Sequence, residues 1–383
     1  MKTHNHRTLI LCLITLFNLN PTASADVIPN PGDIPAGQAL TVNPSDTLFV
    51  EMANGGADLS VWGTLVNQGQ IHAMDSDFYG SNIYIGGIFE NHGNAFVNGA
   101  LSILGGSGTS THKIINHAGG NIVLSGYVDM YSQESQLENA GKFHVIKALG
   151  HNAQAYYGFT AGIIRGNIRN TGTFLIDRNN GMNICQNFGK IVIANEGVFE
   201  IGKDNICDFG IGTVSTNNLT TYRQTKGETV VNGTFGAHML ELQGGTVSGT
   251  GTLLRMPEQF QTAGVNISPG SRGAPFGTLT LVPEANDLIF TFGSINIELG
   301  GPNQGHDRVH VNGDLYVVGA TIINVTLHGG YVPRRGESFT ILSANHIGNH
   351  AGGVASRVKL PQLGAGLSWQ VVNDGLTVKL NVI

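Results

Sequence analysis

The chain has 383 residues and a net charge of −6, and only 12% of its residues are charged, whereas glycine alone contributes 55. Long helices are rich in Ala, Leu, Glu, Lys and Arg, so this composition excludes a mainly helical fold and favours short strands joined by many turns. The hydrophobic content of 41% is sufficient for a buried core, and the sequence has no long basic run that would indicate binding to nucleic acid.

The first 25 residues have the pattern of a signal peptide. Lys2 and Arg7 precede an apolar run over residues 8–19, and Ala23-Ser24-Ala25 forms an A-x-A cleavage site. We therefore expect cleavage after Ala25, a mature chain that begins at Asp26, and export to the cell surface or the extracellular medium. The apolar run is shorter than the ~20 residues of a membrane-spanning helix, and no later stretch reaches that length, so no transmembrane anchor is expected.

The exported part divides into three segments by its sequence pattern. Residues 26–60 contain four prolines, which predicts an irregular N-terminal capping segment. Residues 61–245 contain a repeat of about 24 residues. Residues 246–383 contain a different succession of short strand patterns and end in a predicted hairpin.

The repeat has the form apolar-x-Asn-x-Gly-x-apolar-x-apolar. Its Asn residues recur at intervals of 24, 25, 23, 31 and 25 residues, at Asn67, Asn91, Asn116, Asn139, Asn170 and Asn195. A period of roughly 20–30 residues matches one turn of a parallel β-helix, in which each turn stacks on the last at the ~4.8 Å strand spacing. Leucine-rich repeats share this period, but their denser leucine pattern and their helical segment are absent from the sequence.

Stacking of the turns predicts columns of equivalent side chains. Two residues before the Asn, the column holds Leu65, Phe89, Ile114, Leu137, Ile168 and Ile193. Four residues after the Asn it holds Ile71, Ala95, Phe143, Phe174 and Phe199, and six residues after it holds Ala73, Val97, Val145, Ile176 and Ile201. The alternation of these apolar residues with polar ones is typical of strands with one buried face.

We interpret the Asn and Gly of the repeat as corner residues. Both tolerate positive φ, which a β-branched residue does not, so they can turn the chain between strands. Stacked Asn amides can also hydrogen-bond from one turn to the next, as they do in other stacked-strand assemblies. Ligand binding by these Asn residues is the alternative interpretation.

Two cysteines remain in the exported part, Cys185 and Cys207. Each ends the tripeptide Asn-Ile-Cys, and their separation of 22 residues is close to one turn of the repeat. The two sulfur atoms would then lie one turn apart, and in an oxidising compartment we expect them to form a structural disulfide. Closing a loop of this size would stabilise the fold by ~3 kcal/mol.

After about residue 245 the repeat gives way to an ordered series of motifs. They are GTGTL at 249–253, ISPG at 267–270, GTLT at 277–280, INIELGG at 295–301, DRVHVNG at 307–313 and FTIL at 339–342. This succession resembles the stem region of bacterial autotransporter passengers and related extracellular β-strand-repeat proteins. The resemblance covers about 245–383, and it implies a right-handed parallel β-helix on a secreted protein without implying a substrate.

The C-terminal end departs from that family. An autotransporter ends in a membrane barrel built from ~10-residue amphipathic strands. The sequence up to Ile383 has no such segment, so we expect a protein that is released or held by a partner. Its last residues instead predict a β-hairpin, with strands at 369–372 and 376–383 around the turn Asn373-Asp374-Gly375. Such a hairpin would cap the last turn of the solenoid and cover its open edge.

Two carboxylate pairs and one histidine pair are the candidates for chemistry. Polysaccharide hydrolysis needs two carboxyl groups ~5–9.5 Å apart, and the close pairs in the sequence are Asp75 with Asp77 and Asp204 with Asp208. His92 and His117 each follow a repeat Asn, so they would stack on neighbouring turns and could bind a metal weakly. We interpret all six as solvent-exposed turn residues, and we expect no catalytic residue, no metal and no cofactor.

The 31-residue interval of the repeat predicts a loop that leaves the solenoid. It contains Tyr156, Tyr157 and Phe159. Exposed aromatic rings can stack on sugars or fill a pocket of a partner, and loops on solenoids often carry binding. These three residues are the candidate binding site, and packing of the loop on the solenoid wall is the alternative.

These patterns predict a secreted, adhesin-like or matrix-type interaction protein that acts through an extended β-helix surface. Glycans and cell-surface proteins are the expected partners. The alternatives are a carbohydrate-active enzyme, either a polysaccharide lyase or a hydrolase, and a structural coat or filament component. A concave cleft with two or three convergent carboxylates would favour the enzyme, and self-assembly through the solenoid ends would favour the filament.

Overall fold

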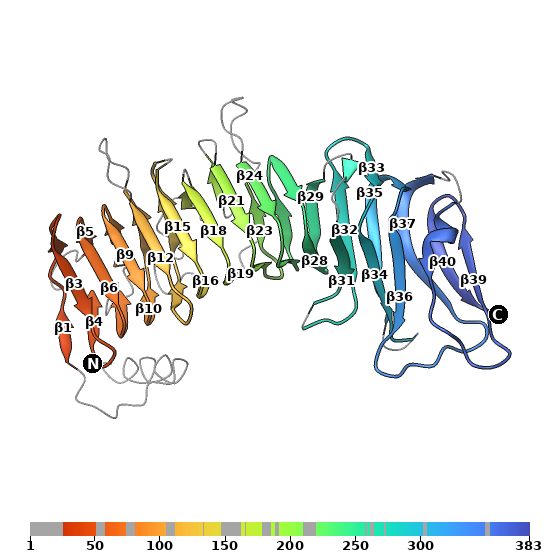
Figure 1. Cartoon of the computed structure of the whole chain (residues 1–383), viewed down its shortest axis with the longest axis horizontal. Helices are drawn as coiled ribbons and strands as arrows, with labels where there is room; N and C mark the ends of the chain where they lie inside the picture. Colours follow the sequence, from red (N-terminus) through yellow and green to blue (C-terminus); the bar gives the residue numbers. More distant parts are fainter. Residues whose placement is uncertain are drawn as a thin grey trace, which may run out of the picture.

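The computed structural model shows the expected all-β parallel β-helix, an elongated solenoid whose turns follow one another from the N-terminal to the C-terminal end (Figure 1). Within the part of the chain that the structure describes, the only helix is the short 3₁₀ helix η1 (Val354–Arg357), and none is long and apolar enough to cross a membrane. The described residues are 26–50, 58–73, 81–104, 112–132, 134–146, 162–164, 166–177, 185–187, 191–209, 220–256, 259–260, 264–271, 273–301, 305–348 and 353–383.

Sheet A runs along the whole solenoid and consists of fourteen strands paired in parallel. Its strands are β1 (Val27–Pro29), β4 (Thr47–Val50), β7 (Gln70–Ala73), β10 (Asn94–Val97), β13 (Asn121–Leu124), β16 (Lys142–Ile146), β19 (Thr173–Asp177), β22 (Val198–Ile201), β25 (Glu228–Val231), β28 (Gly245–Gly249), β31 (Val265–Pro269), β34 (Ser294–Leu299), β36 (Ile322–Leu327) and β38 (Val358–Lys359). The pairing of β1 with β4 shows that the segment 26–60, expected to be irregular, already contributes to the first turns.

Two further sheets give the N-terminal half three sides. Sheet B has seven strands: β2 (Asp33–Ile34), β5 (Leu59–Val61), β8 (Ile83–Ile85), β11 (Ala100–Ile103), β14 (Tyr127–Met130), β17 (Gly162–Ile164) and β20 (Cys185–Asn187). Sheet C has nine strands: β3 (Ala39–Val42), β6 (Thr64–Asn67), β9 (Ile88–Asn91), β12 (Lys113–Asn116), β15 (Gln136–Asn139), β18 (Asn167–Asn170), β21 (Ile191–Asn195), β24 (Thr220–Gln224) and β27 (Met239–Leu242).

A fourth sheet, sheet D, replaces sheets B and C in the C-terminal half. Its ten strands are β23 (Ile206–Asp208), β26 (Thr234–Gly236), β29 (Thr252–Met256), β30 (Gln259–Phe260), β32 (Thr278–Pro283), β33 (Asp287–Phe290), β35 (Arg308–Val317), β37 (Ser338–Gly348), β39 (Trp369–Asn373) and β40 (Thr377–Val382). Sheet C ends at β27, two of its strands after the last repeat Asn, Asn195 on β21, and there the three-sided cross-section becomes two-sided.

The strand register confirms the predicted columns. Leu65, Phe89, Ile114, Leu137, Ile168 and Ile193 pair in succession along sheet C, and all of them are buried. On sheet A, Phe143 pairs with Phe174 and Phe174 with Phe199, and their rings stack with centroids 4.9 Å and 5.2 Å apart. These inward columns form one continuous hydrophobic core along the solenoid.

The repeat asparagines form a buried ladder of amides at the end of the sheet C strands. The Nδ2 of each Asn donates to the Oδ1 of the next at 2.7–2.8 Å, over Asn67, Asn91, Asn116, Asn139, Asn170 and Asn195. The prediction of turn-to-turn amide bonding is therefore confirmed. The prediction of positive φ for these residues is wrong, because among the described residues only Asp204 and Arg255 have positive φ outside glycine.

Close backbone packing, and not positive φ, requires the glycine of most turns. Gly141, Gly172 and Gly197 have no positive φ, but a Cβ atom on any of them would overlap the carbonyl oxygen of the glycine one turn before. That carbonyl oxygen also accepts the turn-to-turn hydrogen bond that begins the next sheet A strand, for example from Thr173 N to Gly141 O at 2.8 Å. Glycine therefore brings successive corners close enough for the ladder to continue.

The C-terminal hairpin is present as predicted. Strands β39 and β40 pair antiparallel, and β40 also pairs antiparallel with β37, the last long strand of sheet D. In the turn, Gly375 has a φ of 87°, and the carboxylate of Asp374 accepts hydrogen bonds from Leu376 N and Thr377 N. The hydroxyl of Thr377 and these backbone N–H groups hold the pKa of Asp374 well below its usual range. The hairpin covers the last turn of the solenoid. It pairs with the backbone groups of an edge strand that would otherwise be open to another chain.

Candidate functional site

The aromatic residues predicted to bind a partner, Tyr156, Tyr157 and Phe159, lie outside the described residues. The signal peptide at residues 1–25 and the pair Asp75 with Asp77 lie outside them as well. The structure therefore does not test these three predictions. The recess described below is lined by residues that the sequence did not single out as a site, and two of them, Leu137 and Ile168, belong to a predicted core column.

The predicted disulfide between Cys185 and Cys207 finds no support, because no disulfide pair occurs in the described part of the chain. Cys207 is buried in the core on β23, at the start of sheet D, whereas Cys185 begins β20, the last strand of sheet B. The side chain of Cys185 is outside the described set. The change from sheet B to sheet D falls between the two cysteines, so a separation of one repeat length does not place them at equivalent positions of one sheet.

The prediction that Asp204 and Asp208 are solvent-exposed turn residues is confirmed for Asp204 and wrong for Asp208, which is buried on β23. Asp204 is exposed in the turn before β23, where it has a φ of 63°. Asp208 is buried and forms an ion pair with Arg255, whose pKa is lowered by burial. One carboxylate faces water and the other is neutralised by a guanidinium, so the two do not converge on a common cleft.

A third carboxyl group, Asp307, has a perturbed pKa for structural reasons. Its two oxygen atoms accept hydrogen bonds from Gly277 N at 3.2 Å and from Glu298 N at 2.9 Å. Burial raises its pKa to about 7 although these bonds favour the charged form. The side chain is 1% exposed, so it is out of reach of a substrate, and it links strands of sheets A and D.

Sheet C presents a long lateral face to solvent. Nine strands at the ~4.8 Å spacing extend over about 38 Å, and their succession from β3 to β24 can be followed along the solenoid in Figure 1. Its outward side chains form two columns: Ala39, Thr64, Ile88, Lys113, Gln136, Asn167, Val192, Thr221 and Met239 in one, and Thr41, Val66, Glu90, Ile115, Glu138, Arg169, Ala194, Arg223 and Glu241 in the other.

The outer face of sheet A is different in the same turns. There the outward column contains Phe49, His72, Phe96 and His144. Phe96 is 2% exposed, and burial lowers the pKa of both His72 and His144. Phe96 is therefore shielded from solvent, whereas Phe49, His72 and His144 are half-buried, like most outward side chains of sheet C.

The lateral face of sheet C is hollowed at strands β15, β18 and β21. The recess exists because Val192 and Ala194 on β21 are shorter than Asn167 and Arg169 on β18 beside them. Its volume is about 220 Å³, and its lining residues are Gln136, Leu137, Glu138, Asn167, Ile168, Arg169, Val192 and Ala194. This volume is below the ~300–1,000 Å³ of pockets that enclose drug-sized ligands, so the recess accommodates a single ring or side chain.

The polar groups around the recess are held in place by their neighbours. Asn167 Oδ1 accepts a hydrogen bond from Val192 N at 2.9 Å, which fixes the amide across the gap between two strands. Glu138 is paired with Lys113 Nζ at 2.8 Å. Arg169 lies 3.8 Å from a carboxylate oxygen of Glu196, and its side chain is 62% exposed, so its guanidinium keeps free donors.

The chemistry of the recess fits a polyhydroxylated ring. The amides of Gln136 and Asn167 both donate and accept, Glu138 accepts, and Arg169 donates, which is the set of groups that hydrogen-bond sugar hydroxyls. The side chains of Val192 and Ala194 give the floor an apolar patch for the C–H face of such a ring. Glu138 is the carboxylate among the residues that line the recess, and a second one, Glu196, lies beside it, paired with Arg169.

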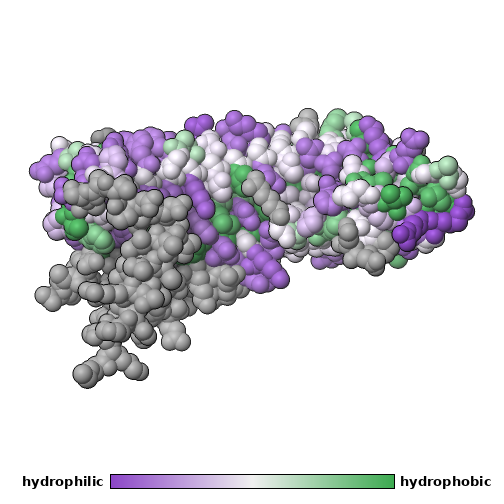
Figure 2. All heavy atoms as spheres, turned by 90° about the horizontal axis from the view of Figure 1, so that it is seen from below, coloured by the Kyte–Doolittle hydropathy of each residue, from purple (hydrophilic) through white to green (hydrophobic). Residues whose placement is uncertain are grey.

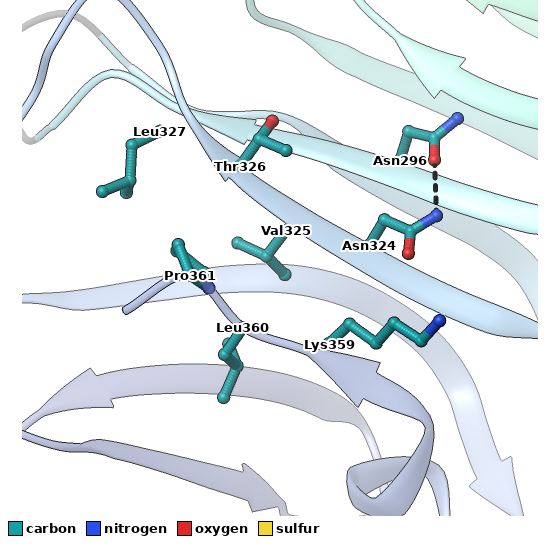
Figure 3. Close-up of a pocket in the computed structure, with 8 residues that line it drawn as sticks. All are labelled: Asn296, Asn324, Val325, Thr326, Leu327, Lys359, Leu360 and Pro361. Carbon is teal, nitrogen blue, oxygen red and sulfur yellow. Dashed lines mark hydrogen bonds between the residues drawn. The ribbon is translucent and has the colours of Figure 1, made fainter. Parts of the chain in front are cut away.

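A larger hollow lies at the C-terminal end (Figure 3). β38 pairs with β36 only at Ile323 and Asn324, after which the chain turns away and leaves space beside the end of β36. Asn324 donates to Asn296 at 3.0 Å on one side of it. The hollow has a volume of about 660 Å³ and is lined by Asn296, Asn324, Val325, Thr326, Leu327, Lys359, Leu360 and Pro361.

Figure 2 shows how polar and apolar side chains are distributed over one face of the molecule. In Figure 2 the described surface is mostly hydrophilic or near neutral, and hydrophobic residues gather towards the C-terminal end. The strongly exposed apolar side chains of that end include Val332, Leu376 and Ile383. Exposed apolar side chains also occur elsewhere, at Val27, Trp62 and Met239, the last of them on sheet C.

Two features of the sequence could have indicated the residues that the sequence analysis did not select. Val192 and Ala194 occupy positions at which neighbouring turns have long polar residues, and the repeat alignment shows this contrast. Glu90 is two residues before His92, so both lie on the outer side of one corner. Neither signal stands out without the register that places one turn against the next.

Comparisons with protein-family models, with curated proteins and with solved structures found no match for the chain. Its function is therefore inferred from the solenoid and its lateral face.

Proposed function

We propose that the protein is an exported, adhesin-like interaction protein that binds glycans through the lateral face of sheet C. The recess between β15 and β21 carries this proposal, since it combines amide, carboxylate and guanidinium groups with an apolar floor. The signal-peptide pattern of residues 1–25 supports export. The resemblance of residues 245–383 to autotransporter passenger stems supports a place at the cell surface or outside the cell.

Binding along the face is expected to be repetitive and individually weak. Turns on either side of the recess present further polar side chains in the same two columns, spaced by the ~4.8 Å of the strands. A glycan chain that lies along the columns would contact several turns at once. Once one sugar is bound, the next sugars are held close to the neighbouring turns at a high effective concentration. Many weak contacts on one rigid body can then give a high overall affinity.

A glycan array with the purified chain tests the proposal. The variant Arg169→Ala removes a charge-assisted donor from the recess, and Ala194→Leu fills its floor. Each should lower the signal by ~10-fold or more, because a hydrogen bond to a charged group contributes about 1.5–3 kcal/mol. Arg223→Ala is the matched control, since Arg223 lies in the same column next to Ala194 but does not line the recess. Arg223 can supply only a weak contact of a flanking turn, since its guanidinium is already paired with Glu241, so its substitution should lower the signal clearly less than Arg169→Ala does, by ~3-fold at most.

Two outcomes would reject the proposal in different ways. If no glycan on the array binds the wild-type chain, glycan recognition is wrong. If a glycan binds but Arg169→Ala and Arg223→Ala weaken it equally, the recess is not the site. Export is tested separately by sequencing the N-terminus of the protein recovered outside the cell, where Asp26 is the expected first residue.

A further inference from the structure

Two histidines and a glutamate meet at the corner that follows β9. Glu90 is on the outward side of β9, and His92 follows the ladder residue Asn91. Asn91 pairs with Asn116 in the register, so His117 occupies the position of His92 one turn later. The two imidazole rings stack with centroids 3.9 Å apart and an interplanar angle of 8°. The predicted stacking of this histidine pair is therefore confirmed, and a carboxylate joins it.

The three side chains place potential metal ligands close together. Glu90 Oε2 lies 3.8 Å from His92 Nε2 and 3.5 Å from His117 Nε2, and one ligand atom from each residue lies within 4.8 Å of the others. Tetrahedral zinc with bonds of ~2.0–2.1 Å to nitrogen and oxygen requires ligand atoms about 3.3 Å apart. The two Nε2–Oε2 distances would have to shorten by a few tenths of an ångström. The two rings, which are nearly parallel, would each have to tilt by roughly 50° so that their lone pairs converge on one tetrahedral ion.

The site also contains an unsatisfied nitrogen. The Nε2 atom of His117 is buried and has no hydrogen-bond partner among the described residues. Both Nε2–Oε2 distances exceed the ~3.2 Å limit of a good N–H···O bond, so Glu90 does not compensate for this. A buried polar atom without a partner costs about 1–3 kcal/mol, and a ligand that supplies a partner recovers it.

The cluster is confined to these two turns. In the turn before, Gln68 follows the ladder Asn, and in the turn after, Ala140 does. The imidazole pair is therefore not part of a longer histidine column. Each of the three side chains is between 33% and 42% exposed, so an ion can reach them from solvent.

We propose that Glu90, His92 and His117 bind one divalent transition-metal ion. Imidazole nitrogen and carboxylate oxygen suit Zn²⁺, Ni²⁺ and Cu²⁺, with Cu²⁺ bound most tightly in the usual order of affinities. Three protein ligands leave a fourth position for water or for a group of a partner. The ion would join the corner after β9 to the corner after β12 and so fasten two successive turns of the solenoid. This inference goes beyond glycan binding and does not depend on it.

Titration of the untagged chain with Zn²⁺ in a calorimeter tests the site, because an affinity tag of histidines would add ligands of its own. We expect one ion per chain, bound in the micromolar range or tighter at pH 7.5. His92→Gln and His117→Gln should each weaken binding by ~10-fold or more.

His328→Gln is the matched control. His328 Nδ1 lies 2.9 Å from Glu298 Oε2, so this variant removes an imidazole from a His–Glu pair that lacks a second histidine. Its Zn²⁺ affinity should equal that of the wild type. As a second readout, saturating Zn²⁺ should raise the melting temperature of the wild type and of His328→Gln but not of His92→Gln. Zn²⁺ binding that survives both histidine substitutions at the corner, or no binding by the wild type, would overturn the proposal.

Discussion

The amide ladder leads to a test of what holds successive turns together. Asn139 accepts a hydrogen bond from Asn116 at 2.7 Å, and it donates to Asn170 Oδ1 at 2.8 Å and to Thr173 O at 2.9 Å. Asn139→Leu keeps the shape of the side chain and removes these three bonds. At about 1–3 kcal/mol for each of the three buried groups left without a partner, the loss is about 3–9 kcal/mol, of which the buried leucine recovers about 2. We expect the free energy of unfolding to fall by about 3 kcal/mol.

The first rung of the ladder supplies the matched comparison. Asn67 pairs with Val42 in the turn before, and its Oδ1 is buried without a partner among the described residues. Asn67→Leu breaks two bonds, to Asn91 Oδ1 and Asn94 O, but it also removes an acceptor that was already unsatisfied. These changes nearly cancel, and the new leucine packs on Val42. The expected loss is therefore close to zero, about 3 kcal/mol less than for Asn139→Leu.

Urea unfolding followed by far-UV circular dichroism measures both variants against the wild type. At a slope of about 3 kcal/mol per molar urea, the midpoint of Asn139→Leu should fall by about 1 M and that of Asn67→Leu should hardly change. Equal midpoint shifts for the two variants would show that the ladder stabilises through shape and not through its hydrogen bonds. Both variants keep the hydrophobic columns intact, so a difference between them comes from the amides.

Three further predictions concern single positions. Val42→Asn should be tolerated, because the new amide can donate to Asn67 Oδ1, whereas Val61→Asn buries an unpaired amide in the core and should cost ~2 kcal/mol or more in urea unfolding. Burial raises the pKa of Asp307 to about 7, so the stabilisation by its protonated form is complete below about pH 4 and is lost as the pH rises towards 7. The free energy of unfolding, measured from pH 4 to pH 8, should therefore fall by up to ~4 kcal/mol, and Asp307→Asn should abolish this fall. Gly172→Ala should lower the melting temperature, at a cost of ~1–3 kcal/mol, because its Cβ would overlap the carbonyl of the turn before.

Periodicity alone was enough to predict the solenoid. The spacing of Asn67, Asn91 and Asn116 fixes the length of a turn, and the apolar residues on both sides fix which strand faces are buried. Because strand side chains alternate with a period of two, a single error in register would have exposed each of the predicted columns. The observed register agrees with the predicted one, and the C-terminal hairpin could be predicted from its turn residues for a similar local reason.

The repeat spacing did not predict features that depend on contacts between different turns. It does not reveal that sheet B ends at β20 and sheet D begins at β23, and it therefore gave no warning that Cys185 and Cys207 lie on different sheets. The predicted reason for the repeat glycines was also wrong. Most of these glycines are required because a Cβ atom would overlap a carbonyl oxygen of the neighbouring turn, and not because their φ is positive.

The sequence by itself determined the fold class, the length of a turn and the inward columns, because these depend on the order of apolar and polar residues along one strand. Only the tertiary structure decided which outward residues meet. The recess beside Val192 and the approach of Glu90 to His92 and His117 depend on distances between turns. Those distances follow from strand register and corner geometry, which many residues determine together and no short motif encodes.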